Sequence, residues 1–157
     1  MQRIHLRAVT DASWREALVL AVWPEQQRFV SEYAPIAAIA LAKAYIRPGG
    51  MNWEPYAIYT DAMMIGFFAL AYEPDTPGHY WLFHFFIDRR HQGRGYGKAA
   101  MERIIEMVRQ KHPQCQTLRL TVHPENLAAQ RLYTAAGFQP TGSERWGEPV
   151  YQLALTQ

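Results

Sequence analysis

The sequence has one cysteine, Cys115, so an intrachain disulfide is excluded. It also has no long apolar run, because the alanine-rich stretch at residues 35–44 is too short to cross a bilayer. The N-terminus lacks the apolar segment of a signal peptide. A lone cysteine fits a reducing compartment. We therefore expect a cytoplasmic protein without a membrane partner.

The chain has little net charge, with 16 Lys and Arg against 14 Asp and Glu, a formal net charge of +2. That balance does not call for a nucleic-acid partner. Internal repeats, low-complexity tracts and linkers are missing, and a hydrophobic content of 49% excludes a disordered chain. A length of 157 residues predicts one domain with its own core, residues 1–157.

Hydrophobic periodicity and turn residues predict a mixed α/β fold. The clearest element is a helix over residues 97–111, because its apolar residues recur at the spacing of one buried stripe. The predicted order is a strand at 3–8, a helix opened by Thr10 or Asp11, a short helical segment from Pro24, a helix at 35–45, strands at 53–60, 63–72 and 79–88, the helix at 97–111, a strand at 117–122, a helix at 126–136, and strands at 138–142 and 149–155.

A glycine-rich turn, residues 92–97, joins the third of those central strands to the clearest helix. Free N–H groups in a first helical turn bind anions, and glycines let a ligand approach the backbone. The spacing lacks the four residues that a P-loop places between its glycines, and the third glycine is out of register for the dinucleotide fingerprint. Positive residues gather here, which favours a phosphorylated ligand over a merely solvated basic loop. They are Arg89, Arg90, His91, Arg94 and Lys98.

Two motifs resemble the GNAT superfamily of N-acetyltransferases. The pattern Q/R-x-x-G-x-G/A between a strand and a helix is its pyrophosphate-binding signature, here with Gln92, Gly95 and Gly97. The block N-x-x-A-x-x-L-Y-x-x-x-G-F resembles its second signature, with every consensus position present at Asn126, Ala129, Leu132, Tyr133, Gly137 and Phe138. The order of predicted elements also matches along essentially the whole chain.

The resemblance implies a GNAT fold: a mostly antiparallel sheet splayed after the fourth strand, with helices on both faces. It implies transfer of an acetyl group from acetyl-CoA to a primary amine by direct attack, without a metal. A bulge near Phe86 and Ile87 would admit the pantetheine arm beside the strand. The implied cofactor-binding residues are Phe85, Phe86 and Ile87 through their main chain, Gln92, Gly93, Arg94, Gly95, Tyr96, Gly97, Lys98, Asn126 and Tyr133.

Tyr133 is implied as the catalytic proton donor to the departing thiolate, with a packed interfacial aromatic as the alternative. The sequence does not single out one residue as the proton acceptor. By register, Trp81 and Phe83 face the substrate, and neither takes a proton. His84 is expected on the other side of the strand unless a bulge occurs earlier. The remaining alternatives are a water chain or a carboxylate from the set Glu25, Glu32 and Glu73.

The segment P-E-Q-x-x-F-V, residues 24–30, resembles bacterial spermine/spermidine acetyltransferases of the superfamily. It points to a polyamine such as spermidine or spermine, held by charge pairing and cation–π contacts. Solvated carboxylates and core tryptophans are the alternative interpretation of the same residues. The candidate acceptor contacts are Glu25, Glu32, Glu54, Trp53, Trp81 and His84.

Other functions remain open at this point. The acceptor is alternatively another small amine or a peptide amine, and the fold also suits a non-catalytic acyl-CoA-binding module. A nucleic-acid-binding domain would need a long basic face with interleaved aromatics, and the basic residues at 89–98 are too local for that. Dimers are frequent in the superfamily, so a homodimer is compatible with the sequence.

Overall fold

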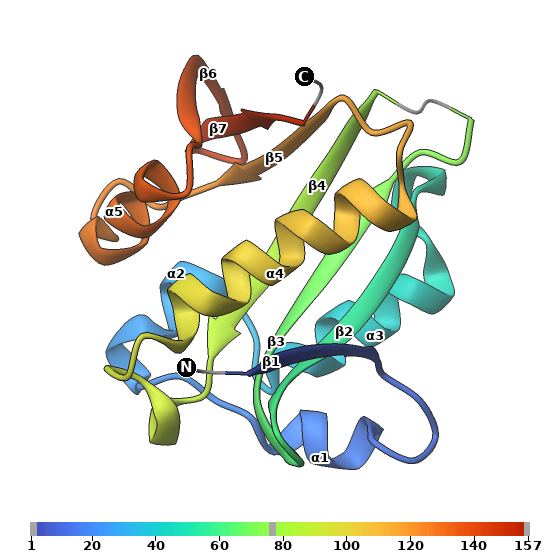
Figure 1. Ribbon diagram of the computed structural model, residues 1–157, viewed down its shortest axis with the longest axis vertical. Coiled ribbons are helices and arrows are strands. Elements are labelled where there is room, and N and C mark those ends of the chain that lie inside the picture. Colours follow the sequence, from blue (N-terminus) through green and yellow to red (C-terminus); the bar gives the residue numbers. More distant parts are fainter. Residues whose placement is uncertain (1–2, 76–77, 156–157) are drawn as a thin grey trace.

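The computed structural model describes residues 3–75 and 78–155, which build a seven-stranded sheet in the order β1-β2-β3-β4-β5-β7-β6 (Figure 1). Its strands are β1 (Ile4–Ala8), β2 (Asn52–Thr60), β3 (Met63–Tyr72), β4 (His79–Ile87), β5 (Thr117–Thr121), β6 (Gln139–Arg145) and β7 (Glu148–Ala154). The helices are α1 (Trp14–Val19), α2 (Gln27–Val30), α3 (Ile36–Ile46), α4 (Tyr96–Lys111) and α5 (Leu127–Ala135), with short 3₁₀ turns η1 (Pro24–Gln26), η2 (Pro48–Gly50) and η3 (Arg89–His91). Each predicted helix and strand has a counterpart, so the mixed α/β prediction is confirmed.

Within the described residues, β4 and β5 form the one parallel pair of this otherwise antiparallel sheet. Their pairing covers only residues 79–81 of β4 and 117–119 of β5. Past that point the strands separate, and Figure 1 shows them meeting near the C-terminus and diverging towards α2 and α5. The sheet is therefore splayed after its fourth strand, as the resemblance implies.

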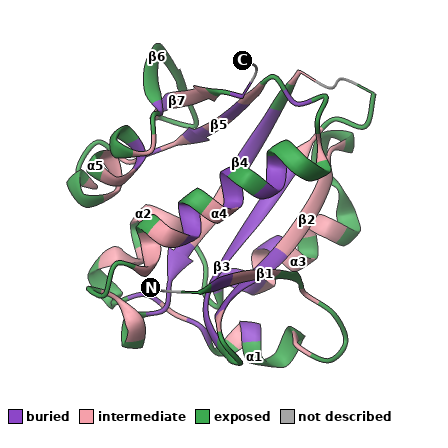
Figure 2. Cartoon of the chain, viewed as in Figure 1, coloured by how far each residue is buried: buried purple, intermediate pink, exposed green. Residues whose placement is uncertain are grey.

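Helices cover both faces of the sheet. Helix α4 packs its buried stripe on one face, and α1 and α3 pack on the other. Successive side chains of β3 pack into opposite layers: Phe68 belongs to the core on the α4 side and Phe67 to the core on the α1–α3 side. Figure 2 shows the resulting buried run along β3 and β4, against the exposed surface of α5 and β6. The end of β4, with Phe86 in one layer and Ile87 in the other, thus carries the glycine turn.

Strand β4 contains a bulge. Between the pairs Ala69–Phe83 and Phe67–Phe86, β3 advances two residues while β4 advances three. His84 takes up the extra residue with a left-handed φ of 57°. The sequence-based placement near Phe86 and Ile87 is wrong, because both of those residues are paired with β3 again. Closure of the ladder there depends on Gly66, where an added Cβ would lie 2.6 Å from the Phe86 carbonyl oxygen.

Asp88 fixes the end of β4. Its carboxylate is 1% exposed and accepts hydrogen bonds from the main-chain N–H of Ala21 at 2.9 Å and from Arg90, through the main chain at 3.0 Å and Nε at 2.7 Å. Burial alone would raise its pKa, yet these hydrogen bonds hold the pKa of Asp88 below its ordinary value. The carboxylate thereby connects the start of the glycine turn to the segment after α1.

We expect Asp88→Asn to lower the free energy of unfolding by about 2 kcal/mol at pH 7, because an amide replaces a charge that receives three hydrogen bonds. A depressed carboxyl pKa stabilises the fold above the unfolded-state pKa of ~3.9, and that contribution is lost as pH falls through the folded pKa. Denaturant unfolding should therefore show the difference shrinking in acid. Asp61→Asn, at an exposed turn with φ 53°, is the control and should stay within about 0.5 kcal/mol of wild type. Equal stability of Asp88→Asn and wild type at pH 7 would contradict the anchoring role.

Candidate active site

The glycine turn presents the N-terminus of α4 to a cavity of about 670 Å³. Gly93 and Gly95 have φ of 79° and 81°, which is the left-handed region that glycine enters without strain. Gly95 is the N-cap residue of the 16-residue helix. The first-turn N–H groups and the helix dipole at that end favour an anion. From the turn and the helix start, the residues that line the cavity are Gln92, Gly93, Gly95, Tyr96, Gly97 and Lys98.

Gln92 holds the turn in place. Its Nε2 donates to the Ile87 carbonyl at 2.9 Å and to Gln26 Oε1 at 3.0 Å, and Gln26 Nε2 donates back to Gln92 Oε1 at 3.1 Å. The same Gln26 oxygen accepts from the Trp23 main chain at 3.2 Å. The P-E-Q segment therefore contacts the glycine turn directly, a link that sequence reasoning missed.

The rest of the cavity suits a long ligand with a polyanionic end. Phe85, Phe86 and Ile87 line it from β4, and Asn126 lines it from the start of α5. Asn126 also caps α5 by accepting from the Ala129 N–H at 3.2 Å. Close packing explains Gly97, since an added Cβ would lie 3.0 Å from Leu132 Cδ1. His91 Nδ1, also in the lining residues, is a buried atom with no hydrogen-bond partner among the described residues.

Two smaller cavities continue from this one. A space of about 120 Å³ lies against β5 and α5, and another of about 260 Å³ reaches the start of β7. Phe29, Val30 and Phe85 line all three spaces. We call the space of about 260 Å³ the inner cavity. The F-V end of the P-E-Q-x-x-F-V segment therefore forms a wall common to the anion site and the inner cavity.

Tyr133 lines both smaller cavities. Its side chain is 9% exposed and packs on the rings of Phe85 and Phe138, with centroids 6.5 and 5.9 Å away. In residues 3–75 and 78–155 its hydroxyl finds no hydrogen-bond partner. Burial, and then the charge of Glu148, raise the pKa of Tyr133, so the phenol keeps its proton at neutral pH. An unpartnered O–H on a side chain that lines a cavity is suited to donate to a ligand.

His84 faces the inner cavity because of the bulge. Its Nδ1 lies 3.1 Å from the Val30 carbonyl oxygen, which only accepts, so Nδ1 carries the proton. Its Nε2 lies 3.3 Å from the ammonium of Lys43 and accepts from it. Burial and the Lys43 charge lower the pKa of His84 to about 4. At neutral pH the imidazole is uncharged and its lone pair is engaged, which makes it a poor proton acceptor.

The sequence profile of the Acetyltransferase (GNAT) family matches residues 11–138. The chain belongs to this family. It is 31% identical over 139 residues to the spermine/spermidine N(1)-acetyltransferase of Bacillus subtilis (strain 168), covering 88% of this chain and 90% of that protein.

Two solved structures share the fold. A spermidine N-acetyltransferase from Vibrio cholerae, in complex with CoA and spermine, superimposes with a TM-score of 0.74 at 17% identity, covering 97% of this chain and 95% of that one. An aminoglycoside acetyltransferase in complex with coenzyme A gives 0.74 at 18% identity over the same shares.

GNAT membership makes this protein an acetyl-CoA-dependent N-acetyltransferase. No group of three or more metal-ligating side chains occurs among the described residues. Nor does any helix in the described part of the chain have the length and apolar character to cross a membrane. Arg94 of the glycine turn is exposed and is not among the residues that line the cavity, so its contact with the cofactor remains a prediction.

The predicted carboxylates are scattered over this GNAT fold. Glu32 lines the inner cavity, whereas Glu25 is exposed in η1 and lines none of the three cavities. Glu54 accepts hydrogen bonds from two tyrosine hydroxyls and lies 3.5 Å from a histidine nitrogen, so it is already engaged in a packed network. Glu73 follows β3 at the end remote from the glycine turn (Figure 1). The structure thus brings only Glu32 of this set to the cavity.

The predicted tryptophans are also placed outside the three cavities. Trp81 is 6% exposed, packs with Ala71 and Val150, and has the Arg145 guanidinium 5.1 Å from its ring centroid. Trp53 stacks on Phe83 at 4.9 Å and has an ammonium of the protein 4.6 Å from its centroid. Each ring therefore already has a cation–π contact with a side chain of this protein. Phe83, the neighbour predicted to face the substrate, does line the inner cavity.

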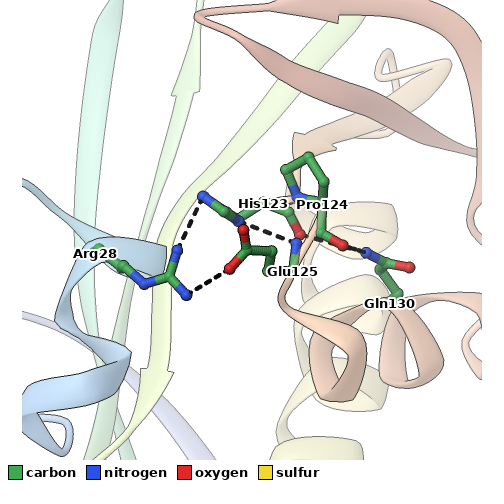
Figure 3. A network of polar contacts seen from close by, with 5 residues as sticks. All are labelled: Arg28, His123, Pro124, Glu125 and Gln130. Atoms are coloured by element: carbon green, nitrogen blue, oxygen red, sulfur yellow. Dashed lines mark hydrogen bonds and ion pairs between the residues drawn. The ribbon is translucent and has the colours of Figure 1, made fainter.

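An unpredicted polar network crosses from α2 to the connection between β5 and α5 (Figure 3). Arg28 Nη2 pairs with Glu125 Oε1 at 2.9 Å, and Nη1 lies 3.4 Å from His123 Nε2. His123 Nδ1 accepts from the Glu125 N–H at 3.1 Å, and Gln130 Nε2 donates to the Pro124 carbonyl at 2.9 Å. The network holds two walls of the cavities together where β4 and β5 diverge.

Proposed function

We propose that this N-acetyltransferase acetylates a primary amine of a polyamine such as spermidine or spermine. The supporting observation is the charge of the inner cavity, which Glu32 and Glu148 line from separate parts of the chain. Neither side chain has an ion pair or hydrogen bond to another described residue. Arg28 lines the same cavity but is paired with Glu125, so the two carboxylates favour a ligand with more than one positive charge. The B. subtilis relative bears a name with the same substrate class.

The chemistry requires a neutral amine. A lysine-like ammonium has a pKa of ~10.4, so releasing its proton at pH 7 costs roughly 4–5 kcal/mol at 1.36 kcal/mol per pKa unit. The departing thiolate, with a cysteine-like pKa of ~8.5, takes a proton that Tyr133 is positioned to give. His84 and Phe85 fall outside the β3 ladder, which supports a role for their main chain in polarising the thioester carbonyl.

Steady-state kinetics across a panel of amines test the substrate class. We expect kcat/KM for spermidine and spermine to exceed that for butylamine by about 100-fold, which corresponds to roughly 2.7 kcal/mol from the second ammonium at a carboxylate. Butylamine is the control because it has one amine and a comparable aliphatic segment. A peptide N-terminal amine and an aminoglycoside complete the panel. A polyamine preference below threefold would refute the substrate class without touching the acetyltransferase activity.

A further inference from the structure

The open question in the inner cavity is which group receives the proton of the amine. Five titratable or charged side chains line it: Arg28, Glu32, His84, Tyr133 and Glu148. Arg28 is a cation paired with Glu125, His84 has its lone pair on Lys43, and Tyr133 holds its own proton. Only the carboxylates Glu32 and Glu148 are left. Glu32 is exposed, in the segment after α2, whereas Glu148 is half-buried at the start of β7.

The β6–β7 hairpin brings Glu148 beside the middle of β4. Trp146 and Gly147 form its turn with φ of 54° and 77°. The indole of Trp146 packs edge-on against Phe83, with ring centroids 5.6 Å apart, and against Trp81 at 5.8 Å. These are the two β4 positions that the sequence predicted to face the substrate, and of the two only Phe83 lines the inner cavity. A carboxylate two residues after Trp146 thereby reaches the cavity from a different strand.

A second, independent observation points to a ligand beside Glu148. Tyr133 is nine-tenths buried, and its hydroxyl is unpartnered among the described residues while its side chain lines the same cavity. The hydroxyl oxygen is not among the fully buried unpartnered atoms, so it is open to the cavity and available to hydrogen-bond a ligand there. The acid that would donate a proton and the carboxylate that would accept one thus lie on the same wall.

We propose that Glu148 binds the reacting ammonium of the acceptor and accepts its proton. The nitrogen gives one proton to Glu148, which passes it to solvent, and then forms the C–N bond to the acetyl carbon. As the C–S bond breaks, the sulfur takes the Tyr133 proton, and the second nitrogen proton restores the phenol. The products are the amide, the free thiol and one released proton. The proposal rests on the proposed function only in needing a primary-amine acceptor.

The test compares Glu148→Gln, Glu148→Asp and Glu32→Gln with a control on the same hairpin, Glu144→Gln, whose residue is exposed on β6 and outside the three cavities. The acceptor is whichever amine of the panel has the highest kcat/KM, polyamine or not. At pH 7 we expect Glu148→Gln to lower kcat/KM about 100-fold. Glu148→Asp should recover at least about tenfold of that loss, and Glu144→Gln should match wild type.

The pH profile separates proton acceptance from packing. Without an acceptor the variant depends on amine that is already neutral, whose fraction rises about tenfold per pH unit below ~10.4. The defect of Glu148→Gln should therefore shrink at least about tenfold between pH 7 and pH 9, while calorimetry gives an unchanged acetyl-CoA affinity. A defect that is equal at both pH values, or a pH 7 loss below threefold, overturns the proposal. A flat amine panel with a pH-dependent Glu148 defect would refute the polyamine alone.

Discussion

Gly95→Glu is expected to raise the Kd for acetyl-CoA by at least about 100-fold, which is roughly 2.7 kcal/mol. Gly95 lines the anion cavity and caps α4 with a φ of 81°. A glutamate there places a side chain where the pyrophosphate must approach the backbone, and it sets a negative charge against the negative ligand. Isothermal titration calorimetry with acetyl-CoA measures the loss directly, without any need for an amine.

The control for Gly95→Glu is Gly142→Glu. Gly142 has a similar φ of 86° in exposed β6, and an added Cβ there meets nothing within 4 Å. Both variants bear the same left-handed strain of roughly 1–2 kcal/mol, but only one bears it at the cavity. Gly142→Glu should therefore bind acetyl-CoA like wild type. Equal affinity losses in the two variants, or none in Gly95→Glu, would remove the glycine turn from the cofactor site.

The glycine turn was predictable because its determinants are local. They are the left-handed glycines, the helix that starts within the turn and its periodic apolar stripe, and all of them lie between residues 92 and 111. The helix predicted over 97–111 is α4 at Tyr96–Lys111. The second motif was equally legible, since Asn126 begins α5 and Tyr133 is buried on it. The local sequence thus predicted the glycine turn and the start of α5, while the candidate donor came from the family resemblance.

The strand bulge could not be placed from β4 alone. It is defined by the pairing with β3, which advances two residues while β4 advances three, and no pattern in residues 79–88 records that pairing. One extra residue reverses which face the following side chains point to. His84 consequently lines the inner cavity, where a regular strand would have turned it away. Register errors of this kind are invisible to periodicity within one strand.

The acceptor site was the least predictable part. A tryptophan or glutamate has the same appearance in a sequence whether it packs in a core or lines a cavity. Trp81 and Glu54 are engaged with neighbours from distant segments, and Glu25 is exposed away from the cavities. Glu148 arrives through a hairpin whose position depends on aromatic packing across the sheet. Its role requires contacts that join residues more than 60 positions apart.

Tyr133→Phe should lower kcat by about 100- to 1000-fold while leaving the Kd for acetyl-CoA within twofold of wild type. The change removes one oxygen that has no partner among the described residues, so the packing of the ring on Phe85 and Phe138 is retained. Loss of a positioned general acid typically costs 10²–10⁴-fold, and a thiolate leaving group of pKa ~8.5 needs the acid less than an alkoxide would. Single-turnover kinetics with saturating acetyl-CoA isolate the chemical step.

Tyr151→Phe is the matched control, because Tyr151 lies on β7 outside the three cavities and should keep the wild-type kcat.

A Tyr133→Phe variant as active as wild type would show that the phenol is a packing residue and that solvent protonates the thiolate. A wild-type protein that binds acetyl-CoA yet acetylates no amine in the panel would instead be an acyl-CoA-binding module, for which a buried, unpartnered hydroxyl has no use. We therefore expect the loss of this hydroxyl to separate catalysis from binding, since it removes one unpartnered oxygen, keeps the ring in place and should slow the chemical step.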